Sequence, residues 1–450
     1  MSSRTALFLA IGLVIVAVGV VAYQWSSRPE PALPDDHAQI APGDTFDDAA
    51  TAVDYYRALL RREPESVDAR IRLAHALLQL GTERGTQAET IPEARELLAE
   101  AVARDPETLY GRSLQASLFN VLHRFEDARD VSRGILADYP VNAYAMGTLV
   151  DALVELGEYD QAVEASDNLL ALKPGLPAYS RASYLRELHG DTDGAIAAMR
   201  LAADAAVGGR PERAWALHHL AGLYLGDAKP DTAAFIYTGI LDEKPDFAPA
   251  LAGLGHVALV KGDADEAVRL LEEARALQPL EMIDELLVEA HLAAGNERAA
   301  EAAAQRVHAA LLTARGFGEV VDMEEADFLA DRDEDLERVL RLAREQQARR
   351  PGHLHANETL AWALYKTGDA AAGIPYIERA MRLDTGDAMV HYRAARIYDA
   401  AGDAAEAARH LRAALDGGLA VESPSTAAEA RTLMASLDGG TSVRATSAAR

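Results

Sequence analysis

The chain repeats one helical pattern about every 34 residues, and this period restricts its possible folds more than any other feature. One small residue inside each Ala- and Leu-rich run marks the period. The marks fall at Ala52, Ala94, Ala128, Ala162, Ala195, Ala233, Ala267, Ala300, Val339, Gly373 and Ala407. A proline follows seven of these marks, 12 residues later in each case: Pro64, Pro106, Pro140, Pro174, Pro245, Pro279 and Pro351. A fixed period of this length indicates a solenoid of stacked units.

Each period contains two amphipathic helices joined by a tight turn. Apolar residues recur three and four places apart, as at Leu251, Leu254 and Ala258, which places them on one helix face. Several turns hold a glycine followed by an acid, as in Gly262-Asp263. Glycine permits the left-handed end of the first helix, and an acidic residue suits the start of the second. We therefore expect an all-α chain of helix pairs.

This pattern resembles the tetratricopeptide repeat (TPR) family, whose 34-residue helix–turn–helix has small residues at its eighth and twentieth places and proline at its thirty-second. The resemblance covers residues 49–415 and implies a right-handed α-solenoid of about ten helix pairs after an unpaired helix near residues 48–62. The repeat phase is ambiguous near residues 315–335. Residues 416–437 are predicted to form a C-terminal capping helix, and residues 438–450 a disordered tail.

The resemblance also implies where a partner would bind. In TPR proteins the concave wall is lined by the second, fifth, ninth and twelfth residues of each first helix. Those places correspond here to Tyr110, Tyr144, Tyr184, Trp215, His218, His256, Glu285, Glu289, Glu358, Trp362, Tyr365, Tyr392 and Arg396. Aromatic side chains offer large contact area at small entropy cost, and the glutamates favour a neutral or basic segment. The alternative is that some aromatics only pack against the next helix pair.

Composition and motifs favour a noncatalytic protein without a cofactor. The chain has 44 Lys and Arg against 71 Asp and Glu, a net charge of −27, which disfavours nucleic-acid binding. It has no cysteine, so thiolate nucleophiles and cysteine-based metal sites are excluded. Asp331, Asp333 and Asp335 are spaced like the start of a calcium loop, but Leu336 and Leu342 stand where that loop needs glycine and an acid. We expect no enzymatic activity and no bound metal.

The N-terminal residues predict a membrane segment. Residues 5–27 form a run of 23 uncharged residues. As a helix this run would extend about 35 Å, enough to cross a hydrocarbon layer of about 30 Å. Arg4 precedes the run and acids follow it, which predicts that residues 1–4 are cytoplasmic and the remainder lies outside. Residues 28–48 are predicted to form a proline-rich acidic linker. The alternative is a signal peptide cleaved near Ala22.

Together these features predict a noncatalytic TPR scaffold, anchored by a single span in a bacterial cytoplasmic membrane with its bulk in the periplasm. It would bind neutral or basic protein or peptide segments in its concave groove. A bacterial source is suggested by the scarcity of lysine, which supplies five of the 44 basic residues. Two alternatives are an envelope-assembly factor acting within a membrane complex and a solenoid secreted after signal cleavage. The sequence does not predict an oligomeric state.

Overall fold

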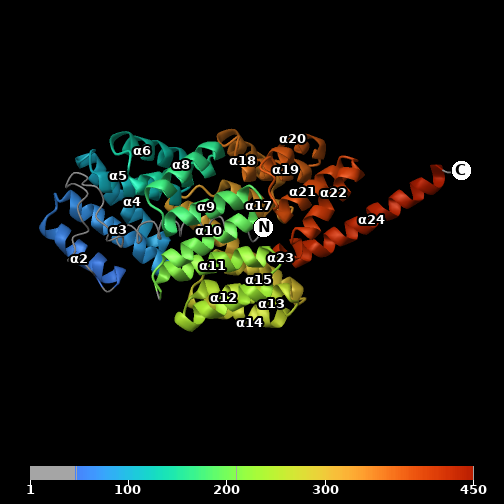
Figure 1. The fold of residues 1–450 in the computed structure, drawn as a ribbon, viewed down its shortest axis with the longest axis horizontal. Helices are drawn as coiled ribbons and strands as arrows, with labels where there is room; N and C mark the ends of the chain where they lie inside the picture. Colours follow the sequence, from blue (N-terminus) through green and yellow to red (C-terminus); the bar gives the residue numbers. More distant parts are fainter. Residues whose placement is uncertain (1–45, 47, 209, 449–450) are drawn as a thin grey trace.

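The computed structural model describes residues 46, 48–208 and 210–448, which form 23 helices and no strand. This part of the chain confirms the predicted all-helical solenoid (Figure 1). The predicted membrane segment at residues 5–27 and almost all of the predicted linker at residues 28–48 lie outside it. Across the described ranges, no helix combines the length and the apolar character needed to span a bilayer.

The helices follow one another as an unpaired first helix, ten pairs and a C-terminal extension. The first helix is α2 (Ala49–Arg62), which begins where Asp48 accepts the backbone N–H of Thr51. The pairs are α3 (Val67–Arg84) with α4 (Gln87–Arg104), α5 (Leu109–Val121) with α6 (Phe125–Asp138), α7 (Ala143–Glu155) with α8 (Tyr159–Leu172), α9 (Leu176–Leu188) with α10 (Thr192–Ala205), α11 (Pro211–Gly226) with α12 (Pro230–Glu243), α13 (Ala248–Val260) with α14 (Ala264–Leu277), α15 (Glu281–Ala293) with α16 (Glu297–Phe317), α17 (Asp322–Asp331) with α18 (Leu336–Arg349), α19 (Leu354–Lys366) with α20 (Ala370–Ala380), and α21 (Ala388–Ala400) with α22 (Ala404–Asp416). The extension is α23 (Leu419–Glu422) and α24 (Pro424–Ala448).

Small residues at the repeat places hold the two helices of each pair close together. The marked alanines from Ala94 to Ala267 are fully buried. The hydroxyl of Ser183 donates to the carbonyl oxygen of Ala195 across one pair, at 2.7 Å. A Cβ atom added to Gly373 would lie 2.9 Å from the carbonyl oxygen of Ala361, so this pair has no room for a larger residue. The period in the sequence thus reflects close packing between helix backbones.

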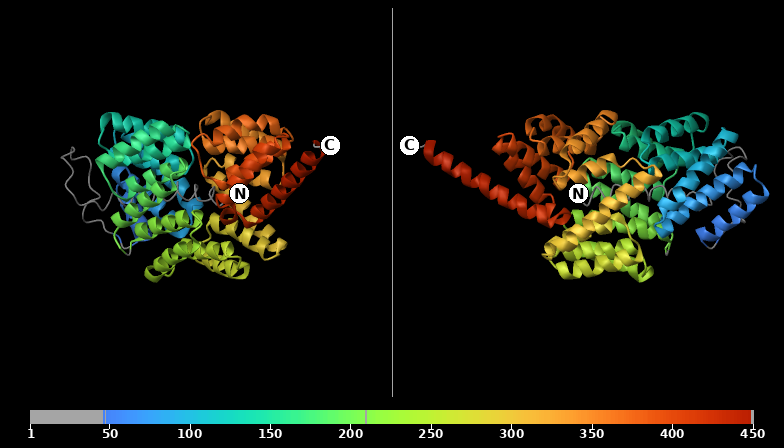
Figure 2. Two further views of the ribbon diagram at one scale, coloured as in Figure 1. Left: turned by 45° about the vertical axis from the view of Figure 1, so that its right-hand side comes forward. Right: turned by 180° about the vertical axis from the view of Figure 1, so that it is seen from behind.

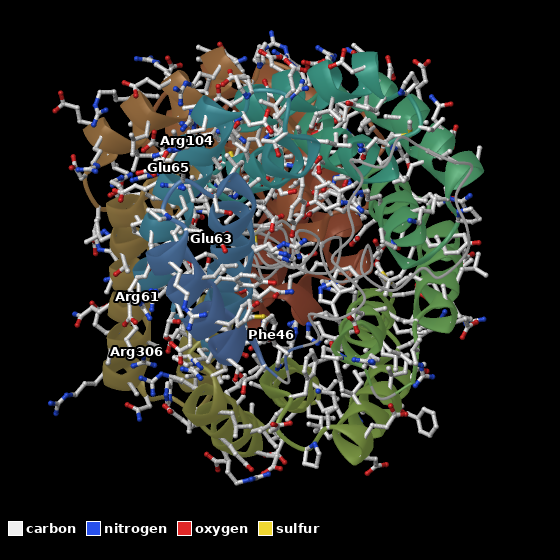
Figure 3. The ribbon with its side chains drawn as sticks, turned by 90° about the vertical axis from the view of Figure 1, so that its left-hand side faces the viewer. Phe46, Arg61, Glu63, Glu65, Arg104 and Arg306 are labelled. Carbon is white, nitrogen blue, oxygen red and sulfur yellow. The ribbon has the colours of Figure 1, made fainter. Side chains whose placement is uncertain are left out.

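The first helices of the pairs form the inner layer of the coil. Neighbouring first helices pack against one another, as α3 does on α5, α5 on α7, α11 on α13 and α19 on α21. Viewed from the α2 end, the helices run around the axis of the molecule, with α2 nearest the viewer (Figure 3). Side chains on the first helices are therefore the ones that can face the inside of the solenoid.

The coil is compact, because its second turn returns onto its first. The backbone N–H of Leu354 donates to the Tyr159 hydroxyl at 3.1 Å, across 195 residues of sequence. The backbone N–H of Val320 donates to the carbonyl oxygen of Leu122 at 3.2 Å. A Cβ atom on Gly157 would lie 2.2 Å from the backbone at His353, so the two turns touch through their main chains. Figures 1 and 2 show the resulting contact between the α6–α8 and α18–α20 regions.

Two parts of the chain depart from the simple period. The ambiguous stretch at residues 315–335 contains the end of the long helix α16, which runs to Phe317, and the short helix α17. At the C-terminus the sequence predicts one capping helix at residues 416–437 and a tail. The structure instead breaks the chain at Gly417 and Gly418 and continues α24 as far as Ala448, away from the coil (Figure 1). No proline follows Pro424, so no residue forces this helix to stop.

Candidate binding groove

The first two predicted groove residues are hydrogen-bonded to the preceding first helix. The Tyr110 hydroxyl on α5 bonds Nδ1 of His75 on α3, and the two rings meet edge to face with centroids 5.9 Å apart. The Tyr144 hydroxyl on α7 bonds the hydroxyl of Ser117 on α5. Both tyrosines are half-buried, and burial raises the pKa of Tyr110. These rings tie neighbouring first helices together as well as occupying groove places.

Trp215 on α11 lies in the core, with only 6% of its surface exposed. It packs in one apolar cluster with Leu176 and Met199, and its ring lies 4.3 Å from that of His219. Tyr184 on α9 is partly buried against the same cluster. Trp215 therefore does not offer a free ring to a partner, and its large side chain instead joins the α9–α10 pair to α11.

Further along the coil, Glu358 and Trp362 on α19 belong to a buried ion-pair network. Arg393 on α21 is 3% exposed and donates to Glu358 at 2.9 Å and to Asp327 on α17 at 3.0 Å. Nδ1 of His355 lies 2.9 Å from Glu358. The Trp362 ring N–H donates to Asp331 at 2.8 Å. Both groove residues are thus committed to contacts within the protein.

Protonation of His355 follows from this network. Burial alone would lower its pKa, but Asp327 and Glu358 outweigh burial and raise the pKa of His355 to about 10. The same histidine and Arg393 hold the pKa of Asp327 below its ordinary value, against the effect of burial. At neutral pH the network therefore contains two cationic groups, Arg393 and His355, among the three carboxyl groups of Asp327, Asp331 and Glu358.

The last predicted groove residues form a chain of hydrogen bonds toward α24. Arg396 on α21 donates to the Tyr392 hydroxyl at 2.6 Å and to the Tyr365 hydroxyl at 2.8 Å. Tyr392 in turn donates to Glu429 on α24 at 2.9 Å. The Tyr365 ring stacks on that of Trp362 with centroids 4.7 Å apart. This set connects the last two helix pairs to the C-terminal helix.

Two groove residues in the middle of the coil contact the C-terminal segment 416–425 of the same chain. Nε2 of His256 on α13 lies 2.7 Å from the carbonyl oxygen of Val421, so this nitrogen carries the proton. Glu289 on α15 accepts hydrogen bonds from the hydroxyls of Ser423 at 3.1 Å and Ser425 at 3.0 Å. The C-terminal segment therefore lies on the inner face of α13 and α15.

Beside these contacts, a cavity of about 510 Å³ lies between this segment and the inner layer. Its walls come from α9, α11, α13 and α15 on one side and from residues 416–422 on the other. Six carboxylates line it, with two histidines and no lysine or arginine among the described lining residues: Glu187, Asp227, Glu285, Glu289, Asp416, Glu422, His218 and His256. Four of these, His218, His256, Glu285 and Glu289, are predicted groove residues, so the structure brings them together at one cavity.

Two of the lining side chains have polar atoms without hydrogen-bond partners among the described residues. Both carboxyl oxygens of Glu285 are buried and unpartnered, and so is Nδ1 of His218, a residue only 7% exposed. Burial raises the pKa of Glu285 to about 8 and lowers the pKa of His218 to about 4. At neutral pH the cavity thus offers a neutral imidazole and a carboxyl group that ionises readily when a cation approaches.

Within the described part of the chain, no group of three His, Asp or Glu side chains is placed to hold a metal ion. The acidic stretch after α17 has other partners. Asp331 accepts from Trp362, Lys366 lies 2.7 Å from Asp333, and Asp335 accepts the backbone N–H of Arg338 at the start of α18. These aspartates shape the turn between two helices.

The structure is that of a helical-repeat protein built from stacked hairpins. Tetratricopeptide repeat models match residues 46–83, 224–284 and 336–425. The matched ranges contain helix pairs of the repeat, so these parts of the chain are similar to tetratricopeptide repeats.

One curated relative is 28% identical over 168 residues, the cellulose synthase operon protein C of Pseudomonas fluorescens (strain SBW25). The match covers 35% of this chain and 13% of that protein, so the chain spans only a small part of its relative. Among solved structures, a TPR protein from Parabacteroides merdae ATCC 43184 is 18% identical, with a TM-score of 0.42 over 56% of this chain and 94% of that one. The APC/C hetero-tetramer Cut9–Hcn1 is 17% identical, with a TM-score of 0.39 over 97% of this chain and 95% of that one.

Sequence reasoning missed the C-terminal segment as a part of the candidate groove. Val421, Ser423 and Glu422 lie outside the repeats, and a capping segment is expected to cover the last helix pair rather than α13 and α15. The available signal was the Gly417-Gly418 pair followed by Pro424, which interrupts the helix and lets the chain turn inward.

Proposed function

We propose that this protein is a noncatalytic TPR scaffold that binds a protein or peptide segment at the inner layer of its coil, around the cavity between α9–α15 and residues 416–422. The observation that carries the proposal is the buried Glu285 carboxyl with both oxygens unpartnered on the inner layer. A buried polar group without a partner costs stability, so its presence on a binding layer favours a role in recognition.

The proposal includes attachment to a bacterial cytoplasmic membrane through residues 5–27, with the solenoid on the periplasmic side. Support comes from the sequence alone, namely 23 uncharged residues with Arg4 before them and acids after them. Cleavage near Ala22 is the alternative, and it would release the solenoid from the membrane.

A second candidate is an envelope-assembly factor working inside a membrane complex. The observation that favours it is the partial match to a protein named for the cellulose synthase operon. The two candidates differ in the partner: an integral membrane protein for the assembly factor, and a soluble protein segment for the general scaffold.

Affinity capture from crosslinked, intact membranes tests the proposal with two matched variants of the full chain. Met282 lines the cavity, so Met282→Trp should fill it and reduce partner recovery. Phe235 on the outer helix α12 is 80% exposed, so Phe235→Trp should leave recovery unchanged. Equal recovery with both variants, at equal helical content, would refute binding at the cavity. Integral membrane proteins among the partners would favour the assembly factor.

A further inference from the structure

The cavity beside α15 has the chemistry of a receptor for a positively charged side chain. We propose that it binds an arginine side chain of the partner segment, with Glu285 as the main acceptor and His218 as a second one. The inference rests on the proposed function, since it names the chemistry by which a partner would be recognised at the same place.

Charge is the first argument. The six carboxylates of the lining face the cavity without a lysine or arginine among the described lining residues. A low-dielectric wall strengthens their combined attraction for a cation. An acidic or phosphorylated segment would meet carboxyl groups and neutral imidazoles there and no lining cation, so the cavity disfavours that class of partner.

Hydrogen-bonding capacity is the second argument, and it distinguishes arginine from other cations. Both oxygens of Glu285 lack partners, and a guanidinium group donates two parallel N–H bonds to one carboxylate. Nδ1 of His218 also lacks a partner, and a neutral imidazole can accept one of the remaining guanidinium N–H groups. An ammonium group is a compact point charge and would satisfy these acceptors less completely.

Size and surroundings fit the same ligand. A volume of about 510 Å³ is ample for one arginine side chain and the peptide backbone next to it. Leu223, Leu286 and Met282 give the cavity an apolar side against which the methylene groups of arginine can pack. Burial and the neighbouring Glu285 raise the pKa of Glu281, one helical turn earlier on α15, so a second carboxyl group able to ionise beside a cation lies near the same place.

Fluorescence anisotropy with the full chain tests this inference at roughly physiological ionic strength. The probe is a labelled Gly-Ser peptide carrying three arginines, compared with the same peptide carrying citrulline, which has the same shape without charge. We expect the citrulline peptide to bind at least ~10-fold more weakly. Glu285→Gln should weaken arginine binding by at least ~10-fold, whereas Glu164→Gln, an exposed residue on α8, should change it by less than ~2-fold.

The results separate the arginine site from the more general proposal that a partner binds at the cavity. If the Glu285→Gln and Glu164→Gln variants bound the arginine peptide equally well, the arginine site would be wrong. Equal binding of the arginine and citrulline peptides by the natural chain would also overturn it. Partner recovery that still depends on Met282 would then leave the proposed function standing. A lysine peptide that binds as well as the arginine peptide would contradict bidentate recognition. Met282→Trp keeps the test valid if Glu285→Gln fails to fold, because it blocks the cavity without altering charge.

Discussion

Nε2 of His256 on α13 lies 2.7 Å from the carbonyl oxygen of Val421, and this contact joins the middle of the repeat array to the C-terminal segment 165 residues later. Glu289 on α15 adds two bonds from Ser423 and Ser425. The segment thus forms one side of the acidic cavity. Its attachment is therefore the first feature to test.

Replacing Gly418 should loosen the C-terminal segment. This glycine has a φ of +94°, and a Cβ atom would lie 3.2 Å from the carbonyl oxygen of Gly226. We expect Gly418→Ala to destabilise the segment by about 2 kcal/mol, from backbone strain and crowding together. Hydrogen exchange should show faster exchange at residues 416–437.

Gly262→Ala is the matched control, because Gly262 has a φ of +83° and open space around it. Its cost should come from strain alone, about 1 kcal/mol, and should stay local to the α13–α14 turn. If the two variants gave the same exchange rates at residues 416–437, the seating of this segment against Gly226 would be wrong.

Removing Arg393 should destabilise the second half of the coil strongly. Its guanidinium group is 3% exposed and pairs with Asp327, Asp331 and Glu358, so Arg393→Met leaves His355 as the one remaining cation of this buried network. The expected loss in the free energy of unfolding is about 3–5 kcal/mol. Arg341→Met removes a pair that is more than half exposed, and it should cost less than about 0.5 kcal/mol. Urea denaturation of both variants makes the comparison, and similar losses would contradict the buried network.

The stability of the fold should fall as the pH rises above neutrality. His355 has a folded-state pKa of about 10, against roughly 6.5 in an unfolded chain. Because folding raises this pKa, protonated His355 stabilises the fold in full below about pH 6.5. That contribution is lost progressively as the pH rises through about 10. Denaturation at a series of pH values should show a decline on the order of 2 kcal/mol that His355→Gln removes. An unchanged slope in the variant would show that His355 is not protonated in the folded protein.

Arginine binding should release protons near neutral pH. Glu285 has a pKa of about 8, so it is largely protonated at pH 7 and must ionise to pair with a guanidinium group. The groups that share or border its cavity are His218, His256, Glu289, Glu281 and the other lining carboxylates. Calorimetry in two buffers of different ionisation enthalpy should detect up to one proton released per arginine bound. Glu285→Gln should abolish that release.

The sequence predicts the repeat well because the repeat depends on packing between helices that are neighbours in the chain. Small residues are required at Ala361 and Gly373 because two helix backbones meet there, and the sequence shows this requirement as small residues at a fixed spacing. The contact of Tyr159 with Leu354 cannot be predicted from the sequence. It depends on the small rotation between each helix pair and the next, summed over 195 residues. Trp215 illustrates a second limit. Its repeat place predicts the groove, but the ring packs in the core with Leu176 and Met199.

The membrane segment remains a prediction from residues 5–27. Fractionation should place the full chain with membranes and a chain lacking residues 1–27 in the soluble fraction. Mass spectrometry of the mature protein gives the decisive comparison. A mature N-terminus just after Ala22 would contradict the anchor and favour a cleaved signal peptide.

The most direct test of partner binding at the inner layer is crosslinking from two single-cysteine variants, since the natural chain has no cysteine. Met282→Cys places a thiol at the cavity, and Phe235→Cys places one on the outer helix α12. Each is labelled with a benzophenone maleimide and irradiated in intact membranes. Partner adducts should form from position 282 and not from position 235. Adducts that form equally from both positions, or only from position 235, would contradict the inner cavity as the binding site.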